Sequence, residues 1–421
     1  MFESHTMTPV EPPMKKKTTM PTALSLFSGC GGFCEGMKTA GFDIRAALEM
    51  DRYACETYRH NFPSTPLIEG DVHDFLKPRS SDAKKYRLED LDVVFGGPPC
   101  QGYSQIGTRR LDDERNELYL QYARIVEKQR PRMFLMENVP NMVLLNKGHF
   151  RKLILKKFAS IGYSNAVVLR LSAADFGVPQ LRQRVIFVGT RDEDDFAFDL
   201  ESFCEAVLDS LKVRKHVSVR EAIDDLPDVV VHSGETTAYP EAESLSKFQK
   251  MMRLDHGVGH YTKAVKRQRG LGEDGAVLHN HHTKEIQARR AKLISMLEPG
   301  KKADSLPKEI WDGKRPEKWR RLHPDEPSYT ILAHMHRDLS EWVHPYLDRW
   351  ITVREAARLQ SFHDGFVFQG SEWQQLKQIG NAVPPLMGHA LGMMAQEILK
   401  ALDEGENYDG ITSEMIQLVA A

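Results

Sequence analysis

The sequence predicts an α/β fold with a doubly wound, mostly parallel sheet and a second, smaller domain. Short apolar, β-branched runs alternate with longer stretches that have the apolar spacing of amphipathic helices, which is the pattern of βαβ units. Glycine-rich or acidic segments directly follow several of the runs, at the edge where open α/β sheets bind ligands. A long basic segment then interrupts the alternation, and this indicates the second domain.

The composition is that of a globular protein. Of its 421 residues, 41% are hydrophobic and 28% are charged, so the chain is long enough for two or three domains. The five cysteines are Cys30, Cys34, Cys55, Cys100 and Cys204. They form no CxxC pair, which favours a reducing compartment without a zinc site. No apolar run has membrane length and none follows Lys15–Lys17, so a soluble, intracellular protein without a signal or transit peptide is expected.

The formal net charge of −2 hides an uneven distribution. Between Lys247 and Pro324 there are 19 Lys and Arg residues against 9 Asp and Glu, whereas the remainder has 38 against 50. A basic block of this kind favours a polyanion partner, because neutralising phosphates releases counterions. A solvated lysine-rich face is the alternative that charge alone leaves open.

The first predicted unit is a strand, a glycine loop and a helix. Residues 1–20 are polar and contain prolines, and are expected to form a disordered arm. The strand Ala23–Phe27 runs into the loop Ser28–Gly32, and a helical pattern continues to Ala40. Such a loop lets a nucleotide-like cofactor approach the amides of a helix N-terminus. Its glycines depart from GxGxxG spacing, so no pyrophosphate site is predicted.

Acidic residues follow the next two predicted strands. The run Ile44–Leu48 ends at Glu49, where an acid commonly accepts hydrogen bonds from ribose hydroxyls. Asp71 follows the run Pro66–Glu69, where it could meet an adenine amino group. The exits together outline an adenosine-shaped cleft. Taken singly, Asp51 and Asp71 are better interpreted as helix caps.

The segment Leu91–Ser104 predicts the reactive centre. Leu91–Phe95 reads as a buried strand, and Gly96–Gly97 then lets the backbone turn and approach a ligand. Two prolines, Pro98 and Pro99, hold Cys100 on a rigid loop past the end of this strand. A thiol becomes a strong nucleophile only as the thiolate, so it needs nearby positive charge or helix amides. A small cysteine buried in the core is the alternative.

A carboxylate and two arginines follow the next strands. The run Met133–Met136 ends at Glu137, which would share the cleft with Cys100 and could give and take a proton beside a nucleophile. Arg182 and Arg184 alternate, a spacing that projects both side chains to one side of an extended strand. They could hold a base carbonyl or a phosphate, and a pair of surface arginines is the alternative.

The remaining elements are predicted from apolar periodicity. The further strands are expected at Tyr163–Leu171 and Val185–Thr190. Helices are expected at Asp51–His60, Asn116–Gln129, Lys147–Ser160, Lys284–Leu297, Val353–Phe362 and Leu386–Leu399, the last packing against the first domain. The histidines of residues 279–282 have no cysteine or acid at ligand spacing, so no metal site is predicted there.

Six blocks in this order resemble the cytosine-5 DNA methyltransferase family, and the resemblance covers Ala23 to Met394. The blocks are FSGCGG at Phe27–Gly32, GGPPCQGYS at Gly96–Ser104, MENVPN at Met136–Asn141, PQLRQRV at Pro179–Val185, TVREAARLQSF at Thr352–Phe362 and QIGNAVPP at Gln378–Pro385. Family members often have proline where this chain has His363, a departure that is expected to affect a loop rather than the chemistry.

The resemblance implies a Rossmann-like methyltransferase fold and S-adenosylmethionine as the cofactor. The implied cofactor residues are Phe27, Ser28, Gly29, Gly31 and Gly32 around the methionine and adenosine, Glu49 on the ribose, Asp71 on the adenine, and Pro98, Asn381 and Val383 beside the pocket. The implied catalytic residues are Cys100, which attacks carbon 6 of cytosine, Glu137, which binds and protonates ring nitrogen 3, Arg184 on the base oxygen with Arg182 and Gln180 supporting it, and Asn138, which positions the Cys100 loop. The target base must be flipped out, because neither reacting carbon is reachable inside a stacked duplex.

The resemblance also implies the domain organisation and partners. The catalytic domain would comprise 21–232 and 328–402, the target-recognition domain 233–327, and a polar extension 403–421. The DNA-binding residues would include Lys263, Lys266, Arg267 and Arg269. Double-stranded DNA is the implied partner, a cognate restriction nuclease could act separately, and a cytoplasmic monomer is expected. A transfer-RNA cytosine methyltransferase and a non-catalytic DNA-binding relative are the alternatives. The long basic insert favours DNA, and intact Cys100, Glu137 and Arg184 favour catalysis.

Overall fold

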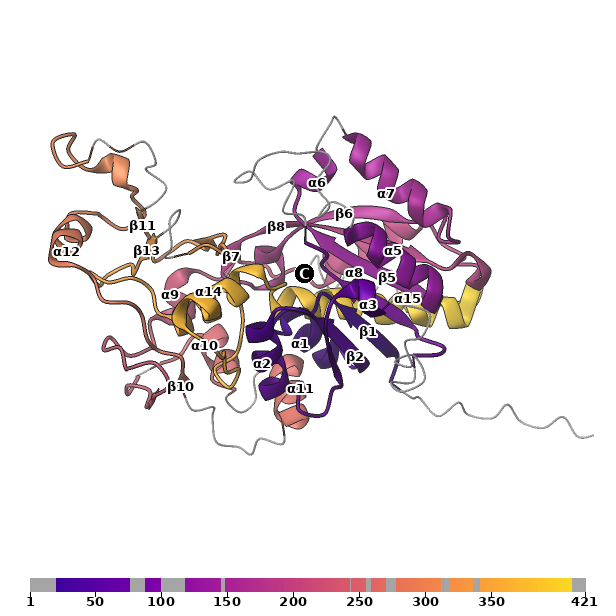
Figure 1. Ribbon diagram of the computed structural model, residues 1–421, viewed down its shortest axis with the longest axis horizontal. Helices are drawn as coiled ribbons and strands as arrows, with labels where there is room; N and C mark the ends of the chain where they lie inside the picture. Colours follow the sequence, from indigo (N-terminus) through magenta and orange to yellow (C-terminus); the bar gives the residue numbers. More distant parts are fainter. Residues whose placement is uncertain are drawn as a thin grey trace, which may run out of the picture.

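A seven-stranded sheet forms the centre of the protein (Figure 1). The computed structural model describes residues 20–75, 88–99, 118–144, 148–242, 244–254, 259–269, 278–311, 313, 319–335 and 341–410. The strand order is β3-β2-β1-β4-β5-β8-β6. The strands are β1 (Thr22–Leu26), β2 (Asp43–Glu49), β3 (Leu67–Glu69), β4 (Val93–Gly96), β5 (Met133–Asn138), β6 (Val167–Ser172) and β8 (Gln183–Thr190).

The sheet is mostly parallel, which confirms the predicted fold class. All pairs from β3 to β5 are parallel, and only β8 runs antiparallel to its neighbours β5 and β6. The antiparallel strand was not predicted, since apolar periodicity carries no information on strand direction. All four residues of β4 are buried, as expected for a central strand covered on both faces.

Helices cover the two faces of the sheet and enclose two hydrophobic cores. Val93 and Phe95 of β4 belong to one core and Val94 to the other, because successive side chains of a strand point to opposite faces. On the first face lie α1 (Gly32–Thr39), α8 (Leu200–Ser210) and α15 (Pro385–Glu404). On the second lie α3 (Val72–Phe75), α5 (Leu118–Gln129) and α7 (His149–Ala159).

The C-terminal helix α15 packs against α1, as predicted. The two helices approach so closely that a Cβ on Gly36 would lie 2.3 Å from the carbonyl carbon of Gly388. A glycine at this crossing therefore serves contact between backbones. The helix completes the core of the main sheet with a segment that is remote in sequence. It continues to Glu404, past the predicted domain end at residue 402.

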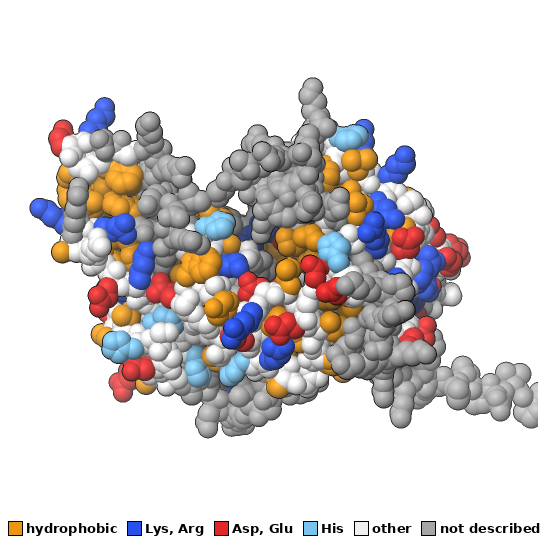
Figure 2. Space-filling model, viewed as in Figure 1, with side chains coloured by type: hydrophobic (Ala, Val, Ile, Leu, Met, Phe, Trp, Pro, Cys, Tyr) orange, Lys and Arg blue, Asp and Glu red, His pale blue; other side chains and the backbone are white. Residues whose placement is uncertain are grey.

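A smaller hydrophobic core holds a separate part of the chain, which we call the small lobe. It contains α12 (Ala288–Ser295), β11 (Trp319–Arg321) and β13 (Glu341–Val343), and its core includes Trp319 and Trp350. The small lobe lies at the opposite end of the molecule from α5 and α7 in Figure 1. Figure 2 shows the surface hollowed between it and the part that carries α6 (Asn141–Leu144).

The small lobe does not coincide with the predicted domain 233–327. Apolar residues of α10 (Lys247–Met252) and α11 (Gly259–Arg269) belong to the core of the main sheet instead. Neither helix was among those predicted from the sequence. Tyr261 and Val265 are four residues apart and give α11 one apolar face, which packs against α1 and α10.

Short elements connect these parts. They are α2 (Arg52–Asn61), α9 (Val219–Ile223), α13 (Val353–Leu359), α14 (Glu372–Asn381), β7 (Gln180–Leu181), β9 (Thr236–Thr237), β10 (Leu278–His279), β12 (Ser328–Tyr329), and the 3-10 turns Ala173–Phe176, Asp192–Asp194, Ala303–Ser305 and Gly405–Asn407. Residues 1–19 of the predicted arm and 411–421 of the predicted extension lie outside the described residues. Across the described ranges, no helix is both long and apolar enough to span a membrane.

Candidate active site

The glycine loop after β1 leaves open space at the carboxyl edge of the sheet. Phe27, Gly29 and Gly31 all have positive φ angles, of 53°, 55° and 103°. A Cβ on Gly31 would collide with the ring of Phe62 at 2.2 Å, whereas a Cβ on Gly29 would meet nothing within 4 Å. Gly31 is therefore required by packing, while Gly29 borders a free volume in which a ligand could lie.

Glu49 ties this loop to the end of β2. Its Oε2 accepts a hydrogen bond from the amide of Gly29 at 2.7 Å, and its Oε1 accepts from the amides of Met50 and Asp51 at 2.9 and 2.8 Å. Burial raises the pKa of this carboxyl, and the three amides oppose the rise. A carboxylate has about four lone-pair positions, so capacity for a ligand hydroxyl remains.

The two neighbouring aspartates cap helices. Asp51 Oδ1 accepts hydrogen bonds from the amides of Tyr53 and Ala54 at 3.0 and 3.1 Å, and its Oδ2 accepts one from Lys377 Nζ at 2.7 Å. Asp71 Oδ1 accepts from the amide of His73 at 2.8 Å, before the short helix α3. The cap interpretation of both residues agrees with these contacts. A role for Asp71 toward adenine stays a prediction.

The late block QIGNAVPP returns to the start of α1. A Cβ on Gly32 would lie 2.4 Å from the carbonyl oxygen of Val383. The segment at Val383 and the glycine loop after β1 are therefore in direct contact. Asn381, the last residue of α14, is exposed beside it, and Ser28 is buried with its hydroxyl directed to Ser25. Backbone contact thus brings two distant sequence blocks together.

The end of β4 touches β1 and β5 through glycines. A Cβ on Gly96 would lie 2.0 Å from the carbonyl oxygen of Leu26, and one on Gly97 would lie 2.8 Å from Oε2 of Glu137. Asn138 Nδ2 donates a 3.0 Å hydrogen bond to the carbonyl of the buried Pro98. This bond fixes the backbone two residues before Cys100, which itself lies outside the described residues.

Glu137 and Arg184 form an ion pair where β5 and β8 meet. Arg184 Nε lies 2.7 Å from Glu137 Oε1, and each side chain is 11% exposed. A charge-assisted bond of this length orients both groups. The pair is largely shielded from water but still accessible, next to the loop that leads to Cys100.

Gln180 and Arg182 do not project beside Arg184 as the alternating spacing predicted. Arg182 is 1% exposed, and its guanidinium donates to the carbonyls of Ile331, Gly380 and Ala382 at 3.1, 3.0 and 3.0 Å. The chain leaves β7 before Arg182 and enters β8 after it, so the three residues do not share one continuous strand. Both side chains are therefore removed from direct contact with a substrate.

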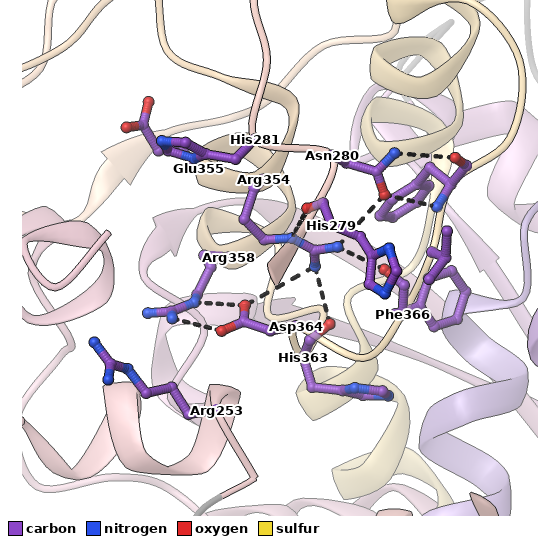
Figure 3. Close-up of polar contacts among 12 residues, drawn as sticks. Arg253, His279, Asn280, His281, Arg354, Glu355, Arg358, His363, Asp364 and Phe366 are labelled. Carbon is purple, nitrogen blue, oxygen red and sulfur yellow. Dashed lines mark hydrogen bonds and ion pairs between the residues drawn. The ribbon is translucent and has the colours of Figure 1, made fainter. Parts of the chain in front are cut away.

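A buried polar network around α13 was missed by sequence reasoning (Figure 3). Arg358 bonds Asp225 at 2.7 Å and Asp364 at 2.6 Å, with all three side chains at most 2% exposed. Arg354 donates to the carbonyls of His279 at 2.9 Å, His363 at 3.0 Å and Phe366 at 2.7 Å. The sequence signal that could have indicated this network is the presence of charged residues among the apolar residues of α13.

His363 is part of a buried pair and not of a surface loop. Its Nε2 lies 3.2 Å from Oε1 of Glu35 in the first turn of α1, and both side chains are at most 1% exposed. The departure from the usual proline therefore reaches the helix that follows the glycine loop. His363 itself lies in the turn after α13, where a loop was expected. Sequence did not show that this turn packs against α1.

The basic residues predicted to bind DNA lie on α11, outside the small lobe. Lys263 is exposed and Lys266 is half-buried. The side chains of Arg267 and Arg269 are outside the described set. In Figure 1 this helix lies beyond α1 and α2, away from β7, β11 and β13. The fold thus separates this basic helix from the small lobe.

The histidines of residues 279–282 are held by the protein itself. His281 Nε2 lies 2.7 Å from the carbonyl of Pro227, and burial lowers the pKa of His281 and of His282. In the part of the chain that the structure describes, no group of three or more His, Cys, Asp or Glu side chains could hold a metal ion.

Comparison with known proteins decides the family. The family of C-5 cytosine-specific DNA methylases matches residues 22–397. The chain belongs to this family. It is similar to the type II methyltransferase M.AgeI of Thalassovita gelatinovora, with 34% identity over 87% of this chain and 97% of that one. It is also similar to M.DdeI of Desulfomicrobium norvegicum, with 33% identity over 87% and 86%.

A solved structure agrees with this assignment. The chain superposes with a TM-score of 0.70 on an Escherichia coli prophage protein described as a DNA modification methyltransferase, at 26% identity over 90% of this chain and 99% of that one. Membership and fold together make this chain a DNA (cytosine-5) methyltransferase, an enzyme that uses a methyl donor and acts on DNA. This confirms the expected family and activity.

Proposed function

We propose that this methyltransferase uses S-adenosylmethionine, held at the ends of β1, β2 and β3. The open space at Gly29 and Gly70, where an added Cβ would meet nothing within 4 Å, fits a ligand that lies against the backbone. Glu49 would accept the ribose hydroxyls, and Asp71 would face the adenine. Phe27, Ser28, Gly31, Gly32, Pro98, Asn381 and Val383 would border the same pocket. When bound, the donor supplies an electrophilic methyl group.

The single observation that carries the mechanism is the Glu137–Arg184 pair at 2.7 Å beside Gly97. Arg184 would hold the base oxygen of a flipped cytosine, and Glu137 would hold and protonate ring nitrogen 3. Protonation draws electrons from the ring, so the thiolate of Cys100 can add to carbon 6. The new sulfur–carbon bond turns carbon 5 into an enamine-like nucleophile.

The remaining steps restore the base. Carbon 5 takes the methyl group as the bond between that group and the donor sulfur breaks. Carbon 5 then loses its proton to solvent water, and the electrons of that carbon–hydrogen bond re-form the double bond and expel the Cys100 thiolate. Ring nitrogen 3 returns its proton to Glu137. Asn138 would keep the loop in place through its bond to the carbonyl of Pro98. Gln180 and Arg182 would act through the backbone that they hold.

Duplex DNA would lie in the hollow between the small lobe and the part that carries α6 (Figure 2). Basic and acidic side chains are interspersed on this face, so base-edge contacts rather than one basic patch would select the sequence. We further propose a cytoplasmic monomer that acts in restriction-modification, as the names of the type II relatives suggest, with any cognate nuclease acting separately.

Bisulfite sequencing of DNA from cells that express the chain tests this proposal. Cytosines protected in one short recurring context, and unprotected with the Cys100→Ser variant, would support the covalent mechanism, because a hydroxyl is a far weaker nucleophile than a thiolate. Equal protection with both chains would remove Cys100 from the reaction. Protection with neither would count against DNA as the substrate of this chain.

A further inference from the structure

Three buried side chains and the backbone of Ile331 and Ala382 form a hydrogen-bonded ring next to the glycine loop. Gln180 and Gln360 are 0% exposed and Arg182 is 1% exposed. Gln180 Nε2 donates to Gln360 Oε1 at 2.5 Å and to the carbonyl of Leu359 at 3.0 Å. We call these three residues the clamp.

One end of the clamp binds both backbone polar groups of Ile331, its amide and its carbonyl. The amide of Ile331 donates to Gln180 Oε1 at 2.9 Å, and its carbonyl accepts from Arg182 Nη1 at 3.1 Å. Ile331 follows β12, which pairs in parallel with β7 of the main part. The chain comes from β11 and goes on to β13, both in the small lobe. Ile331 therefore lies where the chain of the small lobe crosses into the core of the main part.

The other end of the clamp holds Ala382. The carbonyl of Ala382 accepts from Arg182 Nη2 at 3.0 Å and from Gln360 Nε2 at 2.7 Å. Its neighbour Val383 presents the carbonyl that excludes a Cβ on Gly32. A shift of Ala382 would therefore displace the glycine loop directly. The same guanidinium thus touches the connection to the small lobe and the support of the donor site.

The buried charge of Arg182 lowers the stability of the folded protein, so a purely structural role does not explain this residue well. Its described partners are carbonyl oxygens rather than a carboxylate, and burial lowers its pKa well below the ordinary value. An unpaired buried charge costs several kcal/mol, which a nonpolar side chain of similar length would avoid. Retaining such a group is explained more readily by fixed geometry than by stability.

We propose that the clamp couples DNA binding to methyl-donor binding, with Arg182 as the central positioning residue. This inference rests on the proposed donor site and on DNA lying against the small lobe. Adjustment of the lobe to DNA would move Ile331, and the rigid clamp would pass that displacement to Ala382 and the glycine loop. Coupling between two sites is reciprocal, so each ligand tightens binding of the other by the same factor.

The test measures the dissociation constant of S-adenosylhomocysteine by calorimetry, with and without a duplex that contains the methylated context. We expect DNA to tighten binding of this probe to the unaltered chain at least about fivefold, within the usual range of allosteric coupling. In Arg182→Met the effect should fall below about twofold. The KM for the donor at saturating DNA should rise more than kcat falls.

Gln360→Met removes one bond to Ala382 and the bond from Gln180 but leaves the arginine in place, so it keeps the proposal testable if Arg182→Met does not fold. It should reduce the coupling to an intermediate value. Gln121→Met is the matched control, since Gln121 is equally buried but bonds only to Arg124 among the contacts described for its side chain. Coupling that is unchanged in a folded clamp variant, or reduced as much in the control, would overturn the proposal.

The outcome also separates this proposal from the proposed function. If the unaltered chain binds the probe and the duplex but shows no coupling, the clamp proposal fails and the donor site stands. If the unaltered chain does not bind the probe at all, the donor assignment fails first.

Discussion

At the scale of single residues, close backbone approach decides how the reactive groups are placed. A Cβ at position 97 would lie 2.8 Å from the carboxylate of Glu137, so glycine there lets this carboxylate keep its position. The carboxylate in turn pairs with Arg184. The site therefore depends on the absence of a side chain as much as on the side chains present.

Gly97→Ala should lower kcat about 100-fold, since displacing a catalytic group by about 1 Å has an effect of that order. Single-turnover methylation of a duplex would measure it. Donor affinity should change little, because Glu49 ends β2 and Gly29 lies in the loop after β1. A variant with unchanged kcat would show that Glu137 is free to move or has no part in the reaction.

The four described cysteines should be chemically inert. Burial raises the pKa of Cys30 to about 12, of Cys34 to about 11 and of Cys55 to about 12, and raises that of Cys204 as well. Iodoacetamide reacts with thiolates, so at pH 8 the folded enzyme should be alkylated at Cys100 alone. Peptide mass spectrometry gives the site of modification.

The same reaction in concentrated urea is the control for accessibility, and there all five cysteines should react. Modification of Cys55 in the folded enzyme as fast as Cys100 would contradict both the burial and the assignment of the nucleophile.

At the scale of elements, the small lobe is joined to α13 by a pH-sensitive contact. His344 Nδ1 accepts hydrogen bonds from the amides of Tyr346 and Leu347 at 3.2 and 3.1 Å, which requires a neutral ring. Burial lowers the pKa of His344 to about 4, although Glu355 and Arg349 lie close by and the carboxylate opposes the shift.

The unfolded chain therefore binds a proton at higher pH than the folded enzyme does. The free energy of unfolding should fall by about 2 kcal/mol between pH 7.5 and pH 5 from this group alone. The Asn side chain in His344→Asn keeps a hydrogen-bond acceptor but does not titrate. The urea midpoint of this variant should therefore fall less between pH 7.5 and pH 5 than that of the unaltered protein. Equal losses in both proteins would show that His344 does not carry the effect.

The crossing of α1 and α15 gives a second prediction at this scale. Gly36→Ala should destabilise the enzyme by about 3 kcal/mol, because the new methyl group meets backbone atoms that cannot move aside. Gly388→Ala is the matched variant, since its nearest contacts are at 3.3 Å. It should change stability by less than about 1 kcal/mol. Thermal unfolding of both would rank them, and the reverse order would contradict the helix contact.

At the scale of the whole molecule, the fold separates two basic regions that are adjacent in sequence. Helix α11 packs on α1, whereas Lys292 and Lys301 belong to the small lobe beyond it. Lys263→Glu should therefore leave DNA affinity within about twofold. Replacing both Lys292 and Lys301 by Glu should weaken DNA binding. The slope of log affinity against log salt concentration should become shallower by the equivalent of up to about two phosphate contacts. A loss confined to Lys263→Glu would place DNA on α11.

The local sequence pattern was sufficient to predict several strands and the polar residues that follow them. Strand periodicity located β1, β2, β4 and β5, and the polar residues that follow them line one edge of the sheet. This outcome is general, because parallel strands bring their carboxyl ends to the same edge wherever the chain enters them. The Glu137 end of β5 and the Gly97 turn of β4 were predictable for that reason.

Contacts between distant segments could not be read in the same way. The antiparallel direction of β8, the burial of Arg182 against Ile331 and Ala382, and the pairing of His363 with Glu35 each depend on segments that are 149 to 328 residues apart or on strand direction. The position of α11 depends on which apolar face it buries. Sequence by itself determined the family and the mostly parallel sheet, and it proposed the reacting groups. Only packing decided which polar residues are buried in the frame and which stay accessible, because burial is a property of neighbours.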